Sequence, residues 1–285
     1  MKMSSNCYSC VMDRAKFECD MLFERDEEKL EVMEELVDFM AAHKGDVSSV
    51  VGTERENIMK RRSGNLDPYH DLKEESNRAA RDLLPLAVEF YDKSGDGLEA
   101  LIRIAAAANS MEYGVKGHDF DANTFHEVFQ DTLEEKLGGD LEKARGYLDR
   151  FEKILYLTDN AGEIVFDLFV IEKLEEKGKK VVIAPKTEPI LNDVTAEELR
   201  SMTDRPLEPS GPVVGLSLED ARPELLDLLW DEDWLVLAKG MGNFETITEF
   251  DDQLKGRLIY VMRAKCEPVA RRAGVPQGSL VVIPV

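Results

Sequence analysis

Five short apolar runs, separated by helix-like segments, dominate the second half of the chain and restrict its fold more than any other feature. The runs lie at residues 153–158, 180–186, 234–240, 257–264 and 279–285. Each run is continuously apolar instead of alternating with polar residues, as is typical of strands buried on both faces. The intervening segments FDLFVIEKLEEKGK and LSLEDARPELLDLLW favour helix. This alternation indicates an α/β fold: a three-layer α/β/α domain with a mostly parallel sheet.

The first half of the chain shows helical periodicity instead. Apolar residues at three- and four-residue spacing predict one face of a helix in Leu30, Met33, Leu36, Val37 and Met40. LLPLAVEFY, LEALIRIAAAAN and FHEVFQDTLEEKL repeat this spacing, and the Gly138–Gly139 pair is a break between such segments. We therefore predict two parts, a helical region over residues 1–150 and an α/β metal- and phosphate-binding domain over residues 151–285.

The charge of the chain limits its partners. It contains 58 Asp and Glu against 36 Lys and Arg, a formal net charge of −22. This excess repels both nucleic acid and anionic membrane surfaces, so we expect neither as a partner. A small anionic substrate would also be repelled unless a cation were bound at the site itself.

Composition also bears on location. No apolar run approaches the roughly 20 residues of a membrane span. Asp13, Arg14 and Lys16 interrupt the amino-terminal segment in which a secretory signal would need its apolar stretch. Four cysteines do not indicate a disulfide framework. We expect a cytoplasmic protein, and the sequence leaves its oligomeric state open.

Polar residues follow three of the predicted strands at the point where each ends. They are the segments DNAGE at 159–163, the residues around Asn192 and Asp193, and KGMGNFE at 239–245. In open α/β sheets, ligands bind outside the carboxyl ends of the strands. We therefore expect these three segments to form one site.

Asp159, Asn160 and Asp193 are the candidate metal ligands in these segments. Their carboxylate and amide oxygens suit a hard divalent cation such as Mg²⁺ or Mn²⁺. Each residue could instead cap the helix that follows it, because Asp and Asn are common at helix N-termini. The residue types alone leave both interpretations open.

Lys239 is the candidate phosphate contact and, with Asp159 and Glu163, a candidate catalytic residue. It follows an apolar run and precedes glycines, so backbone N–H groups near it can approach phosphate oxygens. The helix start after Gly162 offers further N–H groups to an anion. The other predicted substrate or phosphate contacts are Gly240, Asn243 and Glu245. Glu163 and Glu245 are candidates for proton transfer, or for orienting ligands or capping a helix.

Five segments together resemble the damage-control phosphatase family, formerly known as domain of unknown function eighty-nine. They are DNAGEIVFD, PILNDVT, GPVVGLSLEDA, LAKGMGNFET and RAKCEPVA. The amino-terminal CYSC and the segment GNLDPYHDLK resemble the microbial branch of this family, which carries an early Cys-x-x-Cys. The similarity extends from Cys7 to Cys266.

The resemblance implies a helical region packed on an α/β/α domain, and hydrolysis of phosphate monoesters with Mg²⁺, Mn²⁺, Co²⁺ or Ni²⁺. By similarity, Asp159, Asn160 and Asp193 bind the metal, and Lys239 and Asn243 belong to the family's KGxxN motif. Family members often have a Gly-Asn pair after a helix of small residues, where this chain has Ala108 and Asn109. Asn109 is therefore either a substrate-pocket residue or an interior helix residue.

We predict a metal-dependent phosphatase that acts on a small phosphorylated metabolite, such as a sugar phosphate or a damaged phosphometabolite. The nucleophile is either a water activated by the cation or Asp159 itself. A second interpretation is an S-adenosylmethionine-dependent methyltransferase, although DNAG stands where a GxGxG loop is expected. A third is a non-catalytic module that binds a phosphometabolite or a metal.

Cys7, Cys10 and Cys266 are the candidates for a secondary metal site. The spacing of Cys7 and Cys10 places them on one helix face, and Cys266 lies in the family-like AKCEP segment. A single Cys-x-x-Cys is a weak metal signal. Helix packing without any metal is the competing interpretation.

Overall fold

The computed structural model describes residues 1–110 and 122–285. In chain order the elements are α1 (Ser5–Leu22), α2 (Asp26–Ala42), α3 (Ser48–Ser63), α4 (His70–Lys93), α5 (Gly97–Ala108), α6 (Ala122–Glu134), β1 (Leu137–Gly139), α7 (Leu141–Arg150), β2 (Lys153–Leu157), α8 (Glu163–Glu176), β3 (Lys180–Ala184), α9 (Ala196–Arg200), α10 (Pro223–Trp230), β4 (Trp234–Lys239), α11 (Gly240–Ile247), η1 (Asp251–Leu254), β5 (Leu258–Arg263), α12 (Glu267–Ala273) and β6 (Leu280–Pro284). Within this described part of the chain, no helix combines the length and apolarity needed to cross a membrane.

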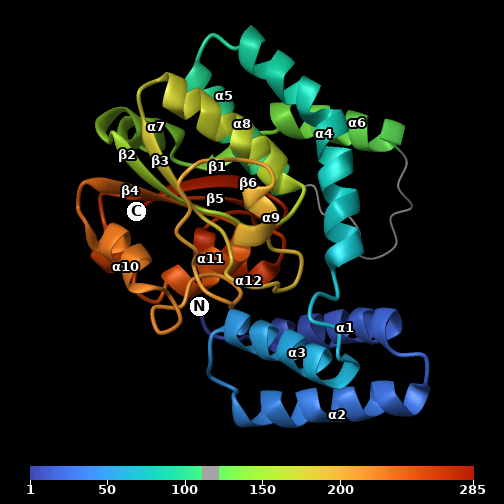
Figure 1. The fold of residues 1–285 in the computed structure, drawn as a ribbon. Coiled ribbons are helices and arrows are strands. Elements are labelled where there is room, and N and C mark those ends of the chain that lie inside the picture. Colours follow the sequence, from blue (N-terminus) through green and yellow to red (C-terminus); the bar gives the residue numbers. More distant parts are fainter. Residues whose placement is uncertain (111–121) are drawn as a thin grey trace.

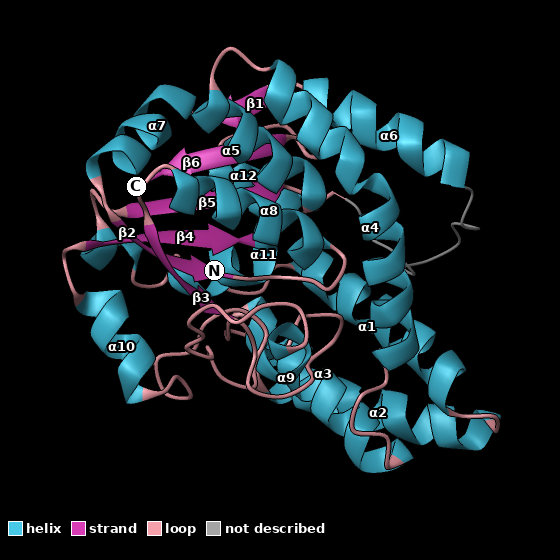
Figure 2. Ribbon diagram, turned by 45° about the horizontal axis from the view of Figure 1, so that its top comes forward, coloured by secondary structure: helices cyan, strands magenta, loops and turns pink. Residues whose placement is uncertain are grey.

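The strands of the described residues form one sheet in the order β1-β6-β5-β4-β2-β3. Neighbouring strands are parallel throughout, except that β5 and β6 are antiparallel. Helices cover both faces of the sheet (Figure 2). The predicted α/β fold with a mostly parallel sheet is confirmed, and the five predicted strands correspond to β2 through β6.

Two hydrophobic cores lie on opposite faces of this sheet. Ile154 and Tyr156 of β2 pack in one core with helices α4 to α8, and Leu155 and Leu157 pack in the other with α10 to α12. Successive side chains of a strand point to opposite faces. Because both faces are covered, every residue from Ile154 to Leu157 is buried, which explains the continuous apolar run.

Helices α1, α2 and α3 form a separate bundle at one end of the molecule (Figure 1). The bundle has its own core, in which Leu36 and Met40 of the predicted helix face are buried. Leu30 and Val37 of that predicted face are exposed, because α2 packs mainly against α1 and α3 and buries a narrower stripe. The bundle contacts the α/β layers through α3, where Lys60 Nζ donates a hydrogen bond to the Pro189 carbonyl oxygen, and through α1, where Asn6 Nδ2 donates to Glu267 Oε2 at 3.2 Å.

The predicted division near residue 150 does not coincide with the division of hydrophobic cores. Helices α4 to α7 contribute to the core on one face of the sheet. The Gly138–Gly139 pair, predicted as a break, lies in strand β1, which pairs with β6 at the edge of the sheet. Residues from α4 onward therefore belong to the α/β layers, while the bundle with a core of its own ends at Ser63.

Candidate metal and phosphate site

The carboxyl ends of β4, β2 and β3 lie side by side, and their polar residues meet there. Asp159 and Asn160 follow β2, and Asp193 lies in the loop after β3. Asn160 and Asp193 form an isolated antiparallel bridge, and the Val194 N–H donates to the Asp159 carbonyl oxygen at 3.0 Å. The two segments are thus held together by their backbones, as the strand-end argument requires.

Two amide side chains hold the Asp159 carboxylate. Asn109 Nδ2 and Asn160 Nδ2 each donate to Asp159 Oδ2 at 2.8 Å. Asn109 Nδ2 also donates to Glu163 Oε2 at 2.8 Å, and Asn109 Oδ1 accepts from the Arg263 N–H at 3.0 Å. Asn109 is therefore a buried residue beneath the carboxylates, and its amide is fully engaged in orienting them.

Lys239 lies deeper than its predicted role as a phosphate contact requires. Its side chain is fully buried, and its ammonium group donates to Glu163 and, at 2.7 Å, to Asp167 Oδ1. The Tyr156 hydroxyl donates to the same Asp167 oxygen at 2.6 Å. Lys239 and Glu163 thus form a buried ionic layer under Asp159, together with Asp167, which the sequence did not suggest.

Backbone requirements at the strand ends explain several predicted residues. Gly240 has φ +76°, and a Cβ built there would lie 1.9 Å from Asp159 Oδ2. Asn243 Nδ2 donates to the carbonyl oxygens of Thr158, at 3.0 Å, and Lys239, at 2.8 Å, so it joins the ends of β2 and β4. The Gly162 N–H, predicted to contact phosphate, donates to Asn77 Oδ1 at 2.7 Å.

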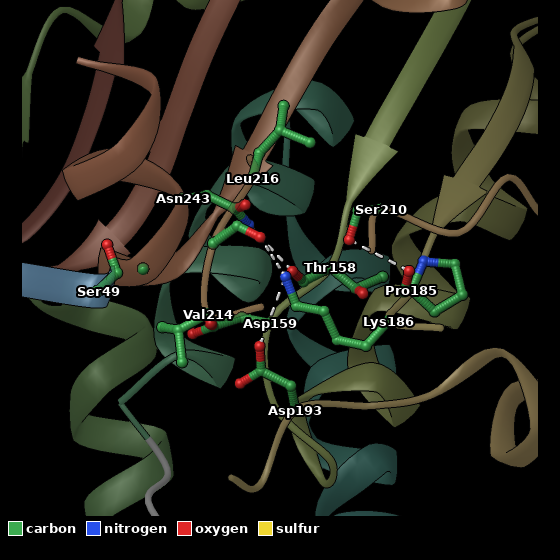
Figure 3. A network of polar contacts seen from close by, with 12 residues as sticks. Ser49, Thr158, Asp159, Pro185, Lys186, Asp193, Ser210, Val214, Leu216 and Asn243 are labelled. Carbon is green, nitrogen blue, oxygen red and sulfur yellow. Dashed lines mark hydrogen bonds and ion pairs between the residues drawn. The ribbon is translucent and has the colours of Figure 1, made fainter. Parts of the chain in front are cut away.

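The site is rich in buried carboxyl groups. Burial raises the pKa of Asp159 well above its usual range, and the carboxylates of Glu163 and Asp193 raise it further. Burial also raises the pKa of Asp193 to about 6, against the opposing effect of Lys186. Lys186 is itself buried, which lowers its pKa, and its Nζ lies 3.7 Å from Asp193 Oδ2 (Figure 3). A bound divalent cation would relieve this concentration of like charge.

Donor chemistry also fits a hard cation. Asp159, Asn160 and Asp193 supply two carboxylates and an amide oxygen, and Asn160 donates through Nδ2, which leaves its Oδ1 for coordination. Among residues 1–110 and 122–285, no group of three or more His, Cys, Asp and Glu side chains is arranged to hold a metal. Such a cation would therefore complete its shell with backbone, water or substrate oxygens.

A cavity of about 230 Å³ opens over these ligands, between the helix bundle and the α/β layers. Asp159, Asn160 and Asp193 line it, as does the predicted contact Glu245, whose pKa is raised by burial. Lys265 lines it as well and lowers the pKa of Asp159 by its charge. Sequence reasoning missed Lys186 and Lys265, although each lies two residues after a strand, the position that had singled out Asp159.

Three of the four cysteines line the same cavity. They are Cys7 and Cys10 of α1 and Cys266 at the start of α12, and all are free thiols. Burial raises the pKa of Cys266 to about 11. The described residues hold no cluster suited to a metal at these thiols, so the predicted secondary metal site has no support beyond the shared cavity.

Comparison with known proteins places this architecture in a family. The model of the damage-control phosphatase ARMT1-like domain matches residues 3–281. A damage-control phosphatase of Archaeoglobus fulgidus is 29% identical over 99% of this chain and 98% of its own length. One from Pyrococcus horikoshii is 33% identical over 76% of this chain and 75% of its own length. The crystal structure of a DUF89 family protein from P. horikoshii covers 100% of this chain and 99% of its own, with a TM-score of 0.88 and 28% identity. The chain belongs to the damage-control phosphatase ARMT1-like family.

Proposed function

We propose that the protein is a cytoplasmic, metal-dependent phosphatase that hydrolyses small phosphate monoesters, such as sugar phosphates or damaged phosphometabolites. The observation that carries this proposal is the meeting of Asp159 and Asn160 with Asp193 at one end of a cavity. The Cys7-x-x-Cys10 pair supports a place in the microbial branch of the family.

Asp159, Asn160 and Asp193 would hold a divalent cation, Mn²⁺, Mg²⁺, Co²⁺ or Ni²⁺. When bound, such a cation would neutralise phosphoryl charge and activate the attacking group. Burial away from water and the charge of neighbouring carboxylates raise the pKa of Asp159 and of Asp193, and such a site favours a cation. Lys265, in the cavity wall, would bind a phosphoryl oxygen as a point charge.

The residues beneath the carboxylates would keep them in position. Asn109 holds the oxygen of Asp159 and that of Glu163 in one arrangement, and Lys239 compensates the charge of Glu163 and Asp167. We therefore assign Lys239 a positioning role instead of the direct phosphate contact expected from the sequence. Preorganised groups of this kind lower the cost of rearrangement when charge develops on the phosphoryl oxygens.

Hydrolysis of p-nitrophenyl phosphate by metal-stripped protein, with and without added Mn²⁺ or Co²⁺, tests this proposal. We expect activity only with metal, and a loss on the order of 10²-fold or more in Asp159→Ala and Asp193→Ala. Asp204→Ala is the matched control, since Asp204 is exposed and lies outside the cavity. Unchanged hydrolysis in the two site variants would refute the assignment. Metal binding without hydrolysis of any ester would favour the non-catalytic alternative.

A further inference from the structure

The helix bundle contributes one wall of the cavity through α1 and α3. In α3, Ser49, Gly52 and Arg55 follow one another at three-residue spacing, so they share a helix face, and all three line the cavity. The strand-end residues Asp159 and Asp193 line the same cavity. Figure 3 shows Ser49 on the blue ribbon of α3, across from these strand-end residues.

Gly52 shows that this face adjoins open space. It is buried, yet a Cβ built on it would meet no atom within 4 Å. A buried helix position normally packs against other side chains, because protein interiors are closely packed. Here the neighbouring volume belongs to the cavity, so Gly52 leaves room for a bound molecule.

Ser49 provides a polar group without a partner. Its side chain is 3% exposed, and its Oγ finds no hydrogen-bond partner in the described part of the chain. The segment around it is fixed, because Thr53 Oγ1 donates to the Ser49 carbonyl oxygen at 2.9 Å and accepts from the Val214 N–H at 3.0 Å. A buried hydroxyl without a partner is costly, and a cavity occupant with a hydroxyl of its own would satisfy it.

Arg55 is held rigidly and is neutralised. Its Nε donates to Glu18 Oε2 and its Nη2 pairs with Glu18 Oε1, both at 2.9 Å. The Tyr69 hydroxyl donates to Glu18 Oε1 at 2.6 Å. This arrangement engages Nε and Nη2 and leaves Nη1 outside the pair. Since Glu18 already balances the charge of Arg55, the group suits a neutral oxygen acceptor better than a second anion.

We propose that the α3 face formed by Ser49, Gly52 and Arg55 determines substrate specificity by binding the hydroxylated part of a phosphate ester. The inference rests on the proposed function, which puts the phosphoryl group at Asp159 and Asp193. The ester would extend from the strand-end residues across Gly52. Ser49 and Arg55 would hydrogen-bond to neutral oxygens on its chain, so that alkyl esters of the same length lack these contacts.

Calorimetric binding of erythritol phosphate and n-butyl phosphate tests the proposal, because these esters match in length and differ in hydroxyl groups. The protein with Asp159 and Asp193 intact is used with Mn²⁺, and each titration is kept short and at low temperature so that turnover does not disturb the measurement. We expect erythritol phosphate to bind at least tenfold more tightly. Ser49→Ala should lower the affinity for erythritol phosphate on the order of fivefold, which corresponds to the loss of one hydrogen bond. The affinity for butyl phosphate should stay unchanged.

Gly52→Val tests the space requirement. The substitution should lower the binding affinity for both four-carbon esters at least tenfold. The affinity for methyl phosphate should stay unchanged, because this ester does not reach α3. Gly146→Val is the matched control, because Gly146 is an exposed helix glycine whose Cβ would also meet nothing within 4 Å. The proposal would be overturned if the two esters bound with equal affinity or if neither bound. It would also be overturned if Ser49→Ala and Gly52→Val both left the binding affinities unchanged. If the binding preference holds but the unsubstituted protein hydrolyses neither ester with any metal, the proposed phosphatase function fails instead.

Discussion

At the scale of single residues, Lys239 shows how the face of a strand decides a side chain's role. Its position after an apolar run suggested a phosphate contact. In β4, however, Leu235 and Leu237 point to the sheet face that α8 covers, and Lys239 follows at the same two-residue spacing. Its ammonium group therefore meets Glu163 and Asp167 of α8 instead of the cavity. The alternation of side chains along β4, and not the residue type, places Lys239 in the buried ionic layer.

Replacing Lys239 by methionine should destabilise the protein strongly. The substitution leaves Glu163 and Asp167 buried without their cation, and breaking a buried ion pair costs about 3–5 kcal/mol. Urea unfolding measures the loss. Lys153→Met is the matched control, because Lys153 is a partly exposed strand lysine that pairs with Asp233 at 3.0 Å on the surface, and we expect far less effect there. Similar losses in the two variants would argue against the buried ionic layer.

The pH dependence of stability should reveal Asp167. Burial raises its pKa from 3.8 to about 6, although Lys239 opposes the shift. The folded state then binds more protons than the unfolded state, so the contribution to stability is present below about pH 4 and is lost as pH rises through about 6. Unfolding free energies of the wild type minus those of Asp167→Asn should fall across this range, by on the order of 2–3 kcal/mol. A flat or rising difference would contradict the raised pKa.

At the scale of elements, the strand-to-helix junctions carry the site. The β2–α8 junction supplies Asp159 and Asn160, and the β4–α11 junction closes over them through Gly240. This glycine has two separate requirements, a positive φ and the absence of a Cβ beside Asp159. The sequence indicated backbone freedom at Gly240, but the neighbouring carboxylate follows only from the adjacent placement of β4 and β2.

Gly240→Ala should weaken metal binding as well as stability. The positive φ alone costs on the order of 1–3 kcal/mol, and the added Cβ must displace the Asp159 carboxylate. We expect Mn²⁺ affinity, measured by calorimetry, to fall at least tenfold. Gly256→Ala separates the two effects, because Gly256 has φ +85° and its Cβ position is open. Equal loss of Mn²⁺ affinity in both variants would show that backbone strain alone is responsible.

At the scale of the whole molecule, the sequence predicted the strands of the sheet better than it predicted which helices pack on them. Continuous apolar runs identified β2 to β6 because burial on both faces leaves that pattern. This pattern could not identify β1, which consists of Leu137, Gly138 and Gly139. That strand forms by pairing with β6. Helical periodicity shows that a helix has a buried face, but not whether a sheet or other helices cover it. Helices α4 to α7 lie in the predicted helical region, and their apolar faces pack on the sheet.

The same limit applies to the site. Asp159, Asn160 and Asp193 could be grouped from sequence because parallel strands bring their carboxyl ends to one edge. The wall made by α3 could not be predicted, since no local pattern shows that a helix near residue 50 docks beside residue 193. The hydrogen bond from Lys60 to the Pro189 carbonyl oxygen is one contact that fixes the position of α3 beside this loop. Specificity residues on the bundle are thus a consequence of tertiary structure alone.

Hydrogen exchange should detect the bundle as a cooperative unit. Because α1 to α3 have their own hydrophobic core, they can open together while the sheet stays folded. We expect faster exchange in all three helices than in β2 and β4.

A ligand that spans the cavity, erythritol phosphate with Mn²⁺, should slow exchange in α1, α2 and α3 alike, because α2 opens only with its neighbours. Mn²⁺ alone should protect the strand ends near Asp159 and leave the bundle unchanged. Exchange that slows equally with Mn²⁺ alone would mean that the bundle responds to the metal and does not bind the ester.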